Sequence, residues 1–249
     1  MTTGNHMNNL FYGLKDRPEF IKGVQHAINQ ISDAGGIYAG DNLFAYHRNL
    51  SFLEDEALVS SARKNATDVE RGILWRTSIL LWAARNGMHL EGDFVECGCY
   101  KGTSAKIVAD ALDFGKLDKR YFLYDLFAHD ASMPHHAMPA HGSELYDSVV
   151  QRFADTPNVR VIQGKVPEVL IDNAPEKIAF LHIDLNNAEA EIGALEVLFE
   201  RMVPGAALVL DDYGWFYYRA QKLAEDPWLA ARGYHVAELP TGQGLVIKR

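Results

Sequence analysis

The chain has few cysteines, no long apolar run and no excess of positive charge, and each shortage excludes a class of protein. Its only cysteines among 249 residues are Cys97 and Cys99. They are too close in sequence to cross-link a fold, so a disulfide scaffold is excluded and a reducing, cytoplasmic location is expected. A metal half-site at this pair would lack the second thiolate pair that completes it. No apolar stretch reaches the roughly 18 residues of a membrane helix.

The charge balance is acidic, with a formal net charge of -9 and a pI near 5.5. An acidic surface repels phosphate backbones and anionic lipid, so we expect neither nucleic acid nor a membrane as partner. Residues 1–9 are polar and lack the basic start and apolar centre of a signal peptide. With 48% hydrophobic residues, the chain can form one sizeable core.

Two regions differ in their patterns. Residues 1–90 are predicted to be mainly helical, with helices over about 17–31, 52–64 and 67–86 and an ordered loop at 41–52. Residues 91–249 alternate short apolar runs with helical segments, which predicts a parallel sheet covered on both faces. We expect one domain, in which the first region is an N-terminal extension of the second.

The predicted sheet has about seven strands. Its first five strands are expected at 94–97, 121–124, 159–162, 178–183 and 206–210. The segments 234–239 and 245–247 flank a turn rich in glycine and proline, so they are expected to form a C-terminal antiparallel hairpin. The predicted class is therefore a doubly wound, mostly parallel α/β fold.

A glycine-containing loop follows the first strand. Segment 96–102 (ECGCYKG) has the spacing E-x-G-x-x-x-G, and cofactors of doubly wound sheets bind at this position. The first glycine of a dinucleotide motif is missing, and Glu96 would be unfavourable beside a phosphate. A sulfonium cofactor has no phosphate, and Asp125 at the end of the next strand suits the hydroxyls of its ribose. The plainer alternatives are an ordinary turn at Gly98 and a helix cap at Asp125.

Three aspartates end two strands that are expected to be neighbours. Asp184 ends the fourth strand, and Asp211 and Asp212 follow the fifth. Neighbouring strands lie about 4.8 Å apart, so these carboxylates are expected to meet. They would repel one another unless protonated or bridged by a cation, and oxygen ligands favour Mg²⁺, Mn²⁺ or Ca²⁺. Alternatively, Asp211 and Asp212 cap the next helix and Asp184 is solvated.

The chain from about Glu91 to Arg249 resembles the macrocin O-methyltransferase family, which methylates sugar hydroxyls of natural products. The matching motifs, in the family's order, are 92–98 (GDFVECG) with 101–102 (KG), 181–184 (LHID), 204–205 (PG) and 208–214 (LVLDDYG). The resemblance implies a Rossmann-like class I methyltransferase fold, S-adenosylmethionine as cofactor, and Mg²⁺ held by Asp184, Asp211 and Asp212. The candidate cofactor-binding residues are Glu96, Gly98, Tyr100, Lys101, Gly102, Thr103, Ser104, Asp125, Gln163, Gly164 and Asp184.

Two segments depart from the family pattern. After the fourth strand, 186–189 (NNAE) stands where the family has a further Asp and a Tyr-Asp pair. After Asp125, 126–129 (LFAH) replaces the family's Ser/Thr-Phe-glycine pattern. We therefore expect the acceptor side of the site to differ.

A histidine-rich segment at 128–142 has no helical or strand period and is expected to be a loop near the cofactor. It is interpreted as a water-excluding lid, as the source of a general base (His129 or His141), or as a second metal site. His182, inside a central strand, is expected to be a core histidine. The aromatic run 215–218 has the spacing of a core, although Tyr213 and Trp215 could line an acceptor pocket.

These observations predict an S-adenosylmethionine-dependent and Mg²⁺-dependent O-methyltransferase that acts on a hydroxylated small molecule of the sugar or natural-product type. Transfer would be an in-line displacement, with Asp184, His129 or His141 as catalytic base. The alternatives are an enzyme of the same fold with other chemistry, a nicotinamide oxidoreductase and a non-catalytic binding protein. A homo-oligomer could form through the N-terminal helical region.

Overall fold

Seven strands form one sheet in the order β6-β5-β4-β7-β8-β10-β9, in which β10 runs antiparallel to both of its neighbours. The structure is a computed structural model and describes residues 4–129, 133 and 137–249. The strands are β4 (Asp93–Cys97), β5 (Tyr121–Asp125), β6 (Val159–Gln163), β7 (Ile178–Ile183), β8 (Met202–Leu210), β9 (Ala237–Glu238) and β10 (Gly244–Ile247).

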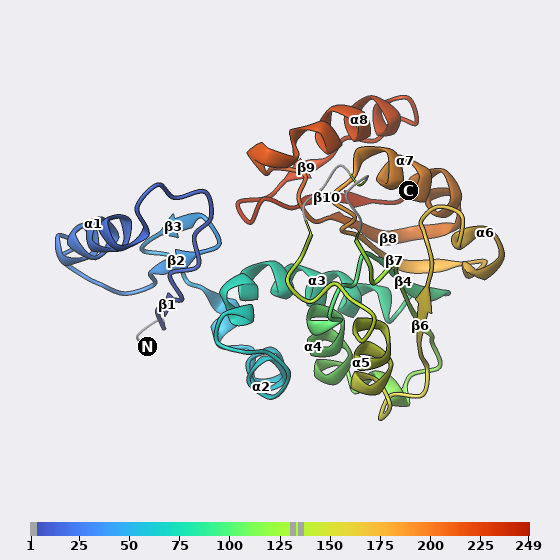
Figure 1. The fold of residues 1–249 in the computed structure, drawn as a ribbon, viewed down its shortest axis with the longest axis horizontal. Coiled ribbons are helices and arrows are strands. Elements are labelled where there is room, and N and C mark those ends of the chain that lie inside the picture. Colours follow the sequence, from blue (N-terminus) through green and yellow to red (C-terminus); the bar gives the residue numbers. More distant parts are fainter. Residues whose placement is uncertain (1–3, 130–132, 134–136) are drawn as a thin grey trace.

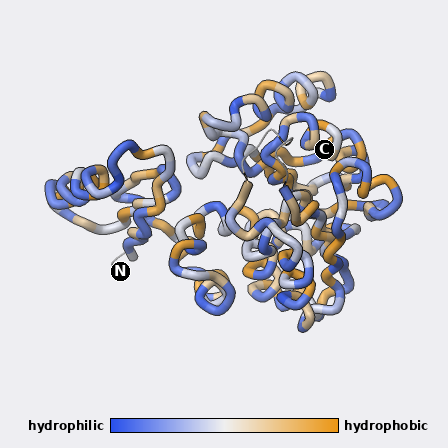
Figure 2. The backbone as a smooth tube through the Cα atoms, in the orientation of Figure 1, coloured by the Kyte–Doolittle hydropathy of each residue, from blue (hydrophilic) through white to orange (hydrophobic). Residues whose placement is uncertain are grey.

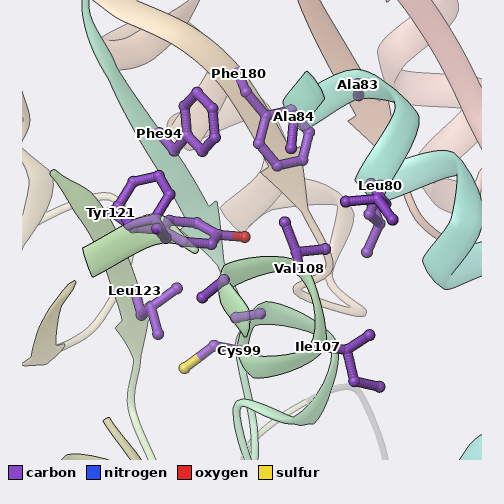
Figure 3. Packing of buried hydrophobic residues seen from close by; sticks show 14 of the residues in the cluster. Leu80, Ala83, Ala84, Phe94, Cys99, Ile107, Val108, Tyr121, Leu123 and Phe180 are labelled. Carbon is purple, nitrogen blue, oxygen red and sulfur yellow. The ribbon is translucent and has the colours of Figure 1, made fainter. Parts of the chain in front are cut away.

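Successive side chains of the apolar strands point to opposite faces of the sheet, and each face is covered by helices (Figure 1). Phe94, Tyr121 and Phe180 face α3 and α4 on one side, as Figure 3 shows. The tube in Figure 2 shows hydrophobic and hydrophilic segments that alternate along the helices. The helices are α2 (Glu56–Asn65), α3 (Leu74–Gly87), α4 (Thr103–Ala111) and α5 (Leu145–Arg152) on this face, and α6 (Leu170–Asn173), α7 (Ala188–Leu198) and α8 (Arg219–Ala230) on the other.

The strand order reverses between β4 and β7. From β4 the chain continues to β5 and β6 on one side, then crosses to β7 on the other. In a doubly wound sheet, ligands bind in the crevice outside the carboxyl ends of the strands at such a switch point. The predicted fold class, with seven strands and a C-terminal antiparallel hairpin, is confirmed.

The N-terminal region contains a small sheet that the sequence did not predict. Strands β1 (His6–Met7), β2 (Tyr38–Gly40) and β3 (Leu43–Ala45) lie beside helix α1 (Arg17–Asn29), to one side of the large sheet (Figure 1). The segment predicted as a loop at 41–52 thus contains β3. Strands of two or three residues are too short to give a recognisable alternation of polar and apolar side chains. Helix α3 follows a 3-10 turn at Glu70–Ile73 and lies between the two sheets in this view.

Strand β8 begins earlier than predicted, at Met202 instead of Ala206. Helix α7 ends at Leu198, and the 3-10 turn Phe199–Arg201 leads directly into the strand. The pairing of β7 with β8 shifts register between Ile178 and Phe180, which accommodates the additional residues. Among the described residues, no helix is both long and apolar enough to cross a membrane.

Candidate functional site

The glycine loop lies at the switch point, where Gly98 meets the backbone of Asp184. Gly98 has a φ of +90°, and a Cβ atom there would lie 1.8 Å from the Asp184 carbonyl oxygen. The Gly98 N–H donates to the Tyr124 carbonyl at 2.7 Å, and the Asp184 N–H donates to the Cys97 carbonyl at 2.8 Å. Glycine is therefore required by a close approach of two chain segments as well as by its φ.

Asp125 ends β5 with its carboxylate fixed beneath the loop. Its two oxygens accept hydrogen bonds from the backbone N–H groups of Tyr100 at 2.7 Å and Phe127 at 2.6 Å. Burial raises the pKa of Asp125, and the two N–H donors counteract that rise. The side chain is partly exposed, so it can accept further hydrogen bonds from hydroxyl groups of a ligand.

The other predicted cofactor-binding residues lie around the same edge. Thr103 donates to Glu70 at 3.2 Å, and the Lys101 ammonium lies 3.6 Å from the same carboxylate. Gln163 donates to the Leu126 carbonyl at 3.2 Å. The Gly164 N–H donates to the Asp125 carbonyl at 3.0 Å. Gly102 directly precedes α4, and Ser104 lies in the first turn of that helix.

The described part of the histidine-rich loop contacts the glycine loop through Tyr100. The Ala140 N–H donates to the Tyr100 hydroxyl at 2.7 Å, and the His141 ring meets the Tyr100 ring edge-on at 5.4 Å. His129 stacks on His141 with 5.9 Å between ring centroids. The described part of this loop therefore lies against the glycine loop, and its role as a lid stays a prediction. His135 and His136 lie outside the described residues.

Glu96 points into the protein and begins a chain of buried polar side chains. The Tyr121 hydroxyl donates to Glu96 at 2.7 Å, and the His182 Nδ1 lies 3.4 Å from the same carboxylate oxygen. The other ring nitrogen of His182 lies 3.5 Å from Asp211. Although burial alone would lower it, the two carboxylates raise the pKa of His182 to about 10, so the imidazole is a cation between two anions. The sequence had placed this histidine in the core.

Asp211 continues this chain and is surrounded by donors. Gln243 donates to its Oδ1 at 2.8 Å, and the Arg76 Nη1 donates to its Oδ2 at 2.6 Å. Burial opposes ionisation, but the positive charges of Arg76 and His182 hold the pKa of Asp211 well below its usual range. Asp211 is therefore a fully hydrogen-bonded anion.

Arg76 comes from α3 and completes the arrangement. Its Nη1 also donates to Asp212 at 3.1 Å, while Nε and Nη2 form a bidentate pair with Asp41 at 2.7 and 2.8 Å. Its guanidinium carbon lies 5.0 Å from the centroid of the Trp215 ring, within range of a cation–π interaction. Only 10% of the Arg76 side chain and 4% of the Asp41 side chain are exposed.

The carboxylates predicted to form a trio have different environments. One ligand atom each of His182, Asp184 and Asp211 lies within 4.8 Å of the others. Burial and the neighbouring Asp211 and Asp212 raise the pKa of Asp184 well above its usual range, and burial together with Asp211 raises that of Asp212 to about 7. Asp184 is thus the weakest acid of the set and borders both the glycine loop and the acidic cluster.

Tyr213 and Trp215, the two aromatic residues considered for an acceptor pocket, lie in different surroundings. Trp215 packs on Arg76, and the Tyr12 ring meets it edge-on at 6.0 Å. Tyr213 is buried and its hydroxyl pairs with Asp226 and Lys222 of α8. Trp215 therefore borders the acidic cluster, whereas Tyr213 anchors α8.

Both cysteines are free and buried, and burial raises the pKa of each thiol. A buried, protonated thiol is a poor metal ligand. They pack in the two hydrophobic layers on opposite faces of the sheet.

Sequence reasoning missed Arg76 and Asp41. A signal for Arg76 was present, because it lies three residues after Ile73 and four before Leu80, so these apolar residues share its side of a helix. An arginine at such a position must find buried anions. Asp41 carried no comparable signal, since its segment showed no periodicity.

A magnesium ion does not fit the predicted trio in this arrangement. Both oxygens of Asp211 already accept hydrogen bonds, and Arg76 binds the Asp211 and Asp212 oxygens that would bridge an ion. The S-adenosylmethionine hypothesis fits better, because the fixed Asp125 carboxylate suits ribose hydroxyls and the cofactor has no phosphate group that a glycine-rich cradle would have to bind.

The comparisons with known proteins agree with this architecture. Residues 95–213 match the family described as a methyltransferase domain. No curated protein matches the sequence.

Several solved structures share the fold. The structure of the O-methyltransferase NovP is 19% identical, with a TM-score of 0.60 over 74% of this chain and 83% of that one. CalS11, a TDP-rhamnose 3'-O-methyltransferase of calicheamicin biosynthesis, is 12% identical, with a TM-score of 0.57 over 96% and 97%. The SAH-bound methyltransferase PaMTH1 of Podospora anserina is 14% identical, with a TM-score of 0.50 over 96% and 100%. The chain therefore has the class I methyltransferase fold, and its residues 95–213 are similar to a methyltransferase domain; a match to the macrocin family in particular is not among these findings.

Proposed function

We propose that this protein is an S-adenosylmethionine-dependent O-methyltransferase that acts on a hydroxyl group of a small molecule. The observation that carries the proposal is the position of Asp184. Its backbone packs on Gly98 of the glycine loop, and its side chain belongs to the acidic cluster. Asp184 thus contacts both the glycine loop, where the cofactor would bind, and the acidic cluster, which contains possible proton acceptors.

The cofactor edge is formed by the loop after β4 and by the end of β5. Asp125 would accept hydrogen bonds from the ribose hydroxyls, while Gly98 lets the loop after β4 turn tightly against the end of β7. When bound, S-adenosylmethionine supplies an electrophilic methyl group on a sulfonium. The NovP and CalS11 structures, whose names describe O-methyltransferases, support an oxygen acceptor.

Asp184 would accept the proton of the acceptor hydroxyl. Burial and the neighbouring Asp211 and Asp212 raise its pKa, so the proton would be accepted by the ionised form of Asp184, which is a stronger base than an ordinary aspartate. Asp212 lies beside it with a pKa of about 7 and can bind a second acceptor hydroxyl. The lid carrying His129 and His141 would exclude water from the reacting atoms, because it lies against Tyr100.

Calorimetry with S-adenosylmethionine and transfer of label from methyl-labelled cofactor to a panel of hydroxylated compounds test the proposal. Asp125→Asn is expected to weaken cofactor binding about tenfold, because it replaces a charged acceptor with a neutral one. Asp113→Asn, an exposed aspartate, is the control and should leave binding unchanged. Cofactor affinity that survives in Asp125→Asn would contradict the assigned edge.

Asp184→Asn separates binding from chemistry. The variant is expected to bind cofactor while the rate of methyl transfer falls by about 10² or more, the usual contribution of a positioned base. Transfer of label at the wild-type rate in this variant would exclude Asp184 as the base. A wild-type protein that binds cofactor but labels no compound would favour another chemistry on the same fold.

A further inference from the structure

We propose that Arg76 is the resident cation of the acidic site and that methyl transfer here is independent of a divalent metal ion. The proposal concerns the site of the proposed function and rests on that function only for its activity measurement. Arg76 would thus take the place of the magnesium ion that was expected from the sequence.

The first argument is the position of Arg76 Nη1. This nitrogen donates to Asp211 at 2.6 Å and to Asp212 at 3.1 Å, and so joins the two carboxylates. An Mg²⁺ ion bridging the same oxygens at about 2.1 Å would lie against the guanidinium. Two cations cannot share this position, because their repulsion in a buried site is large.

The second argument is that Arg76 is fixed from its other side. The planar fork of Nε and Nη2 holds both oxygens of Asp41, and the Trp215 ring covers the guanidinium. Bidentate, buried pairs of this kind are the strongest side-chain hydrogen bonds. Moving Arg76 aside for a metal ion would leave Asp41 buried without its cation, which is strongly unfavourable.

The third argument is the alternation of charge along the whole chain of contacts. From β4 to the turn after β2, the order is Glu96, His182, Asp211, Arg76 and Asp41. Every carboxylate in this series contacts a positively charged side chain, and Asp211 contacts two, His182 and Arg76. The protein therefore already supplies a cation to Asp211 and Asp212, two of the three carboxylates whose repulsion motivated a metal ion.

Mn²⁺ titration followed by electron paramagnetic resonance tests the proposal on the full chain without substrate. Wild-type protein is expected to bind no Mn²⁺ at the site, whereas Arg76→Gln is expected to gain one site with at least about tenfold higher affinity, because the three carboxylates of Asp41, Asp211 and Asp212 lose their cation. Arg76→Lys keeps a positive charge and should remain without Mn²⁺. Arg85→Gln, from an exposed pair on the same helix, is the matched control and should behave as wild type.

Two results would overturn the proposal. One is a single Mn²⁺ site in wild-type protein that is lost in Asp211→Asn. The other is a folded Arg76→Gln variant, verified by circular dichroism, that gains no affinity for Mn²⁺. If Arg76→Gln fails to fold, the wild-type titration and the Arg76→Lys variant still decide between the two cations.

The activity measurement compares label transfer before and after treatment with EDTA. We expect the rate to be unchanged, and restoration of a lost rate by Mg²⁺ would overturn the metal-independent mechanism. Failure to bind S-adenosylmethionine at all would instead contradict the proposed function, while the Mn²⁺ result would stand by itself.

Discussion

At the scale of single residues, Asp184 and Gly98 explain why the site lies at the switch point. The Gly98 backbone fits against the Asp184 carbonyl only because glycine has no Cβ. This contact holds the end of β7 beside the loop after β4, so the side chain of Asp184 emerges next to the cofactor edge. The glycine and acidic motifs, far apart in sequence, are thus parts of one structural unit.

Gly98→Ala should therefore destabilise the protein strongly. The new methyl group would overlap the Asp184 carbonyl, and alanine disfavours a φ of +90°, so we expect a loss of about 2–4 kcal/mol in the free energy of unfolding. Denaturant unfolding measures this loss. Gly23→Ala is the control, because its Cβ would meet nothing within 4 Å and helix propensity favours alanine by up to about 1 kcal/mol. Equal stabilities for the two variants would refute the steric argument.

At the scale of elements, α7 and α8 hold a buried acidic pair behind the site. Gln221 and the Leu185 N–H donate to Glu191 at 2.6 and 3.1 Å, and Glu225 is fully buried beside it. Burial raises the pKa of Glu225 from 4.5 to about 7 and also raises that of Glu191. The two helices therefore pack best when this pair retains a proton.

This pair predicts that stability falls as pH rises. A carboxyl group with a raised folded-state pKa stabilises the fold fully below pH 4.5, and that contribution is lost as pH rises to about 7. The loss is about 3 kcal/mol, because each tenfold change in proton affinity is worth about 1.4 kcal/mol. Urea unfolding between pH 5 and about 8 should show a shallower decline for Glu225→Gln than for wild type. The exposed Glu196→Gln on α7 is the control, and an identical decline in all three proteins would rule out the pair as the cause.

The sequence predicted the large sheet well because its strands are short apolar runs bounded by glycine, proline and charged residues. Strands such as β5 and β7 lie within a residue of their predicted ends. Strands β2 and β3 were missed because three residues contain less than two full alternations. The local sequence pattern therefore predicts strands that consist of a continuous apolar run. The same pattern does not predict very short strands, which are stabilised by tertiary contacts.

At the scale of the whole molecule, the chain of alternating charges connects the small N-terminal sheet with the large one. It runs from β4 through β7 and β8 to α3, and ends at Asp41. The sequence predicted that Asp184, Asp211 and Asp212 follow strands that lie side by side, which the sheet order bears out. It did not predict the cation, since Arg76 and Asp211 are distant in sequence and pair only after α3 has packed on the sheet. We propose that residues 1–90 and 91–249 form one folding unit through this contact.

Asp41→Asn tests this unit. The substitution leaves Arg76 buried without its bidentate partner, so we expect a loss of about 2–4 kcal/mol in the free energy of unfolding. Hydrogen exchange should also rise in residues 38–45, because the turn that carries Asp41 loses its attachment to α3. Asp55→Asn is the matched control, since Asp55 pairs with Arg85 of the same helix at a more exposed position, where a loss below about 1 kcal/mol is expected. Unchanged exchange in 38–45, with equal stabilities for the two variants, would show that the N-terminal sheet is held to the core by other contacts.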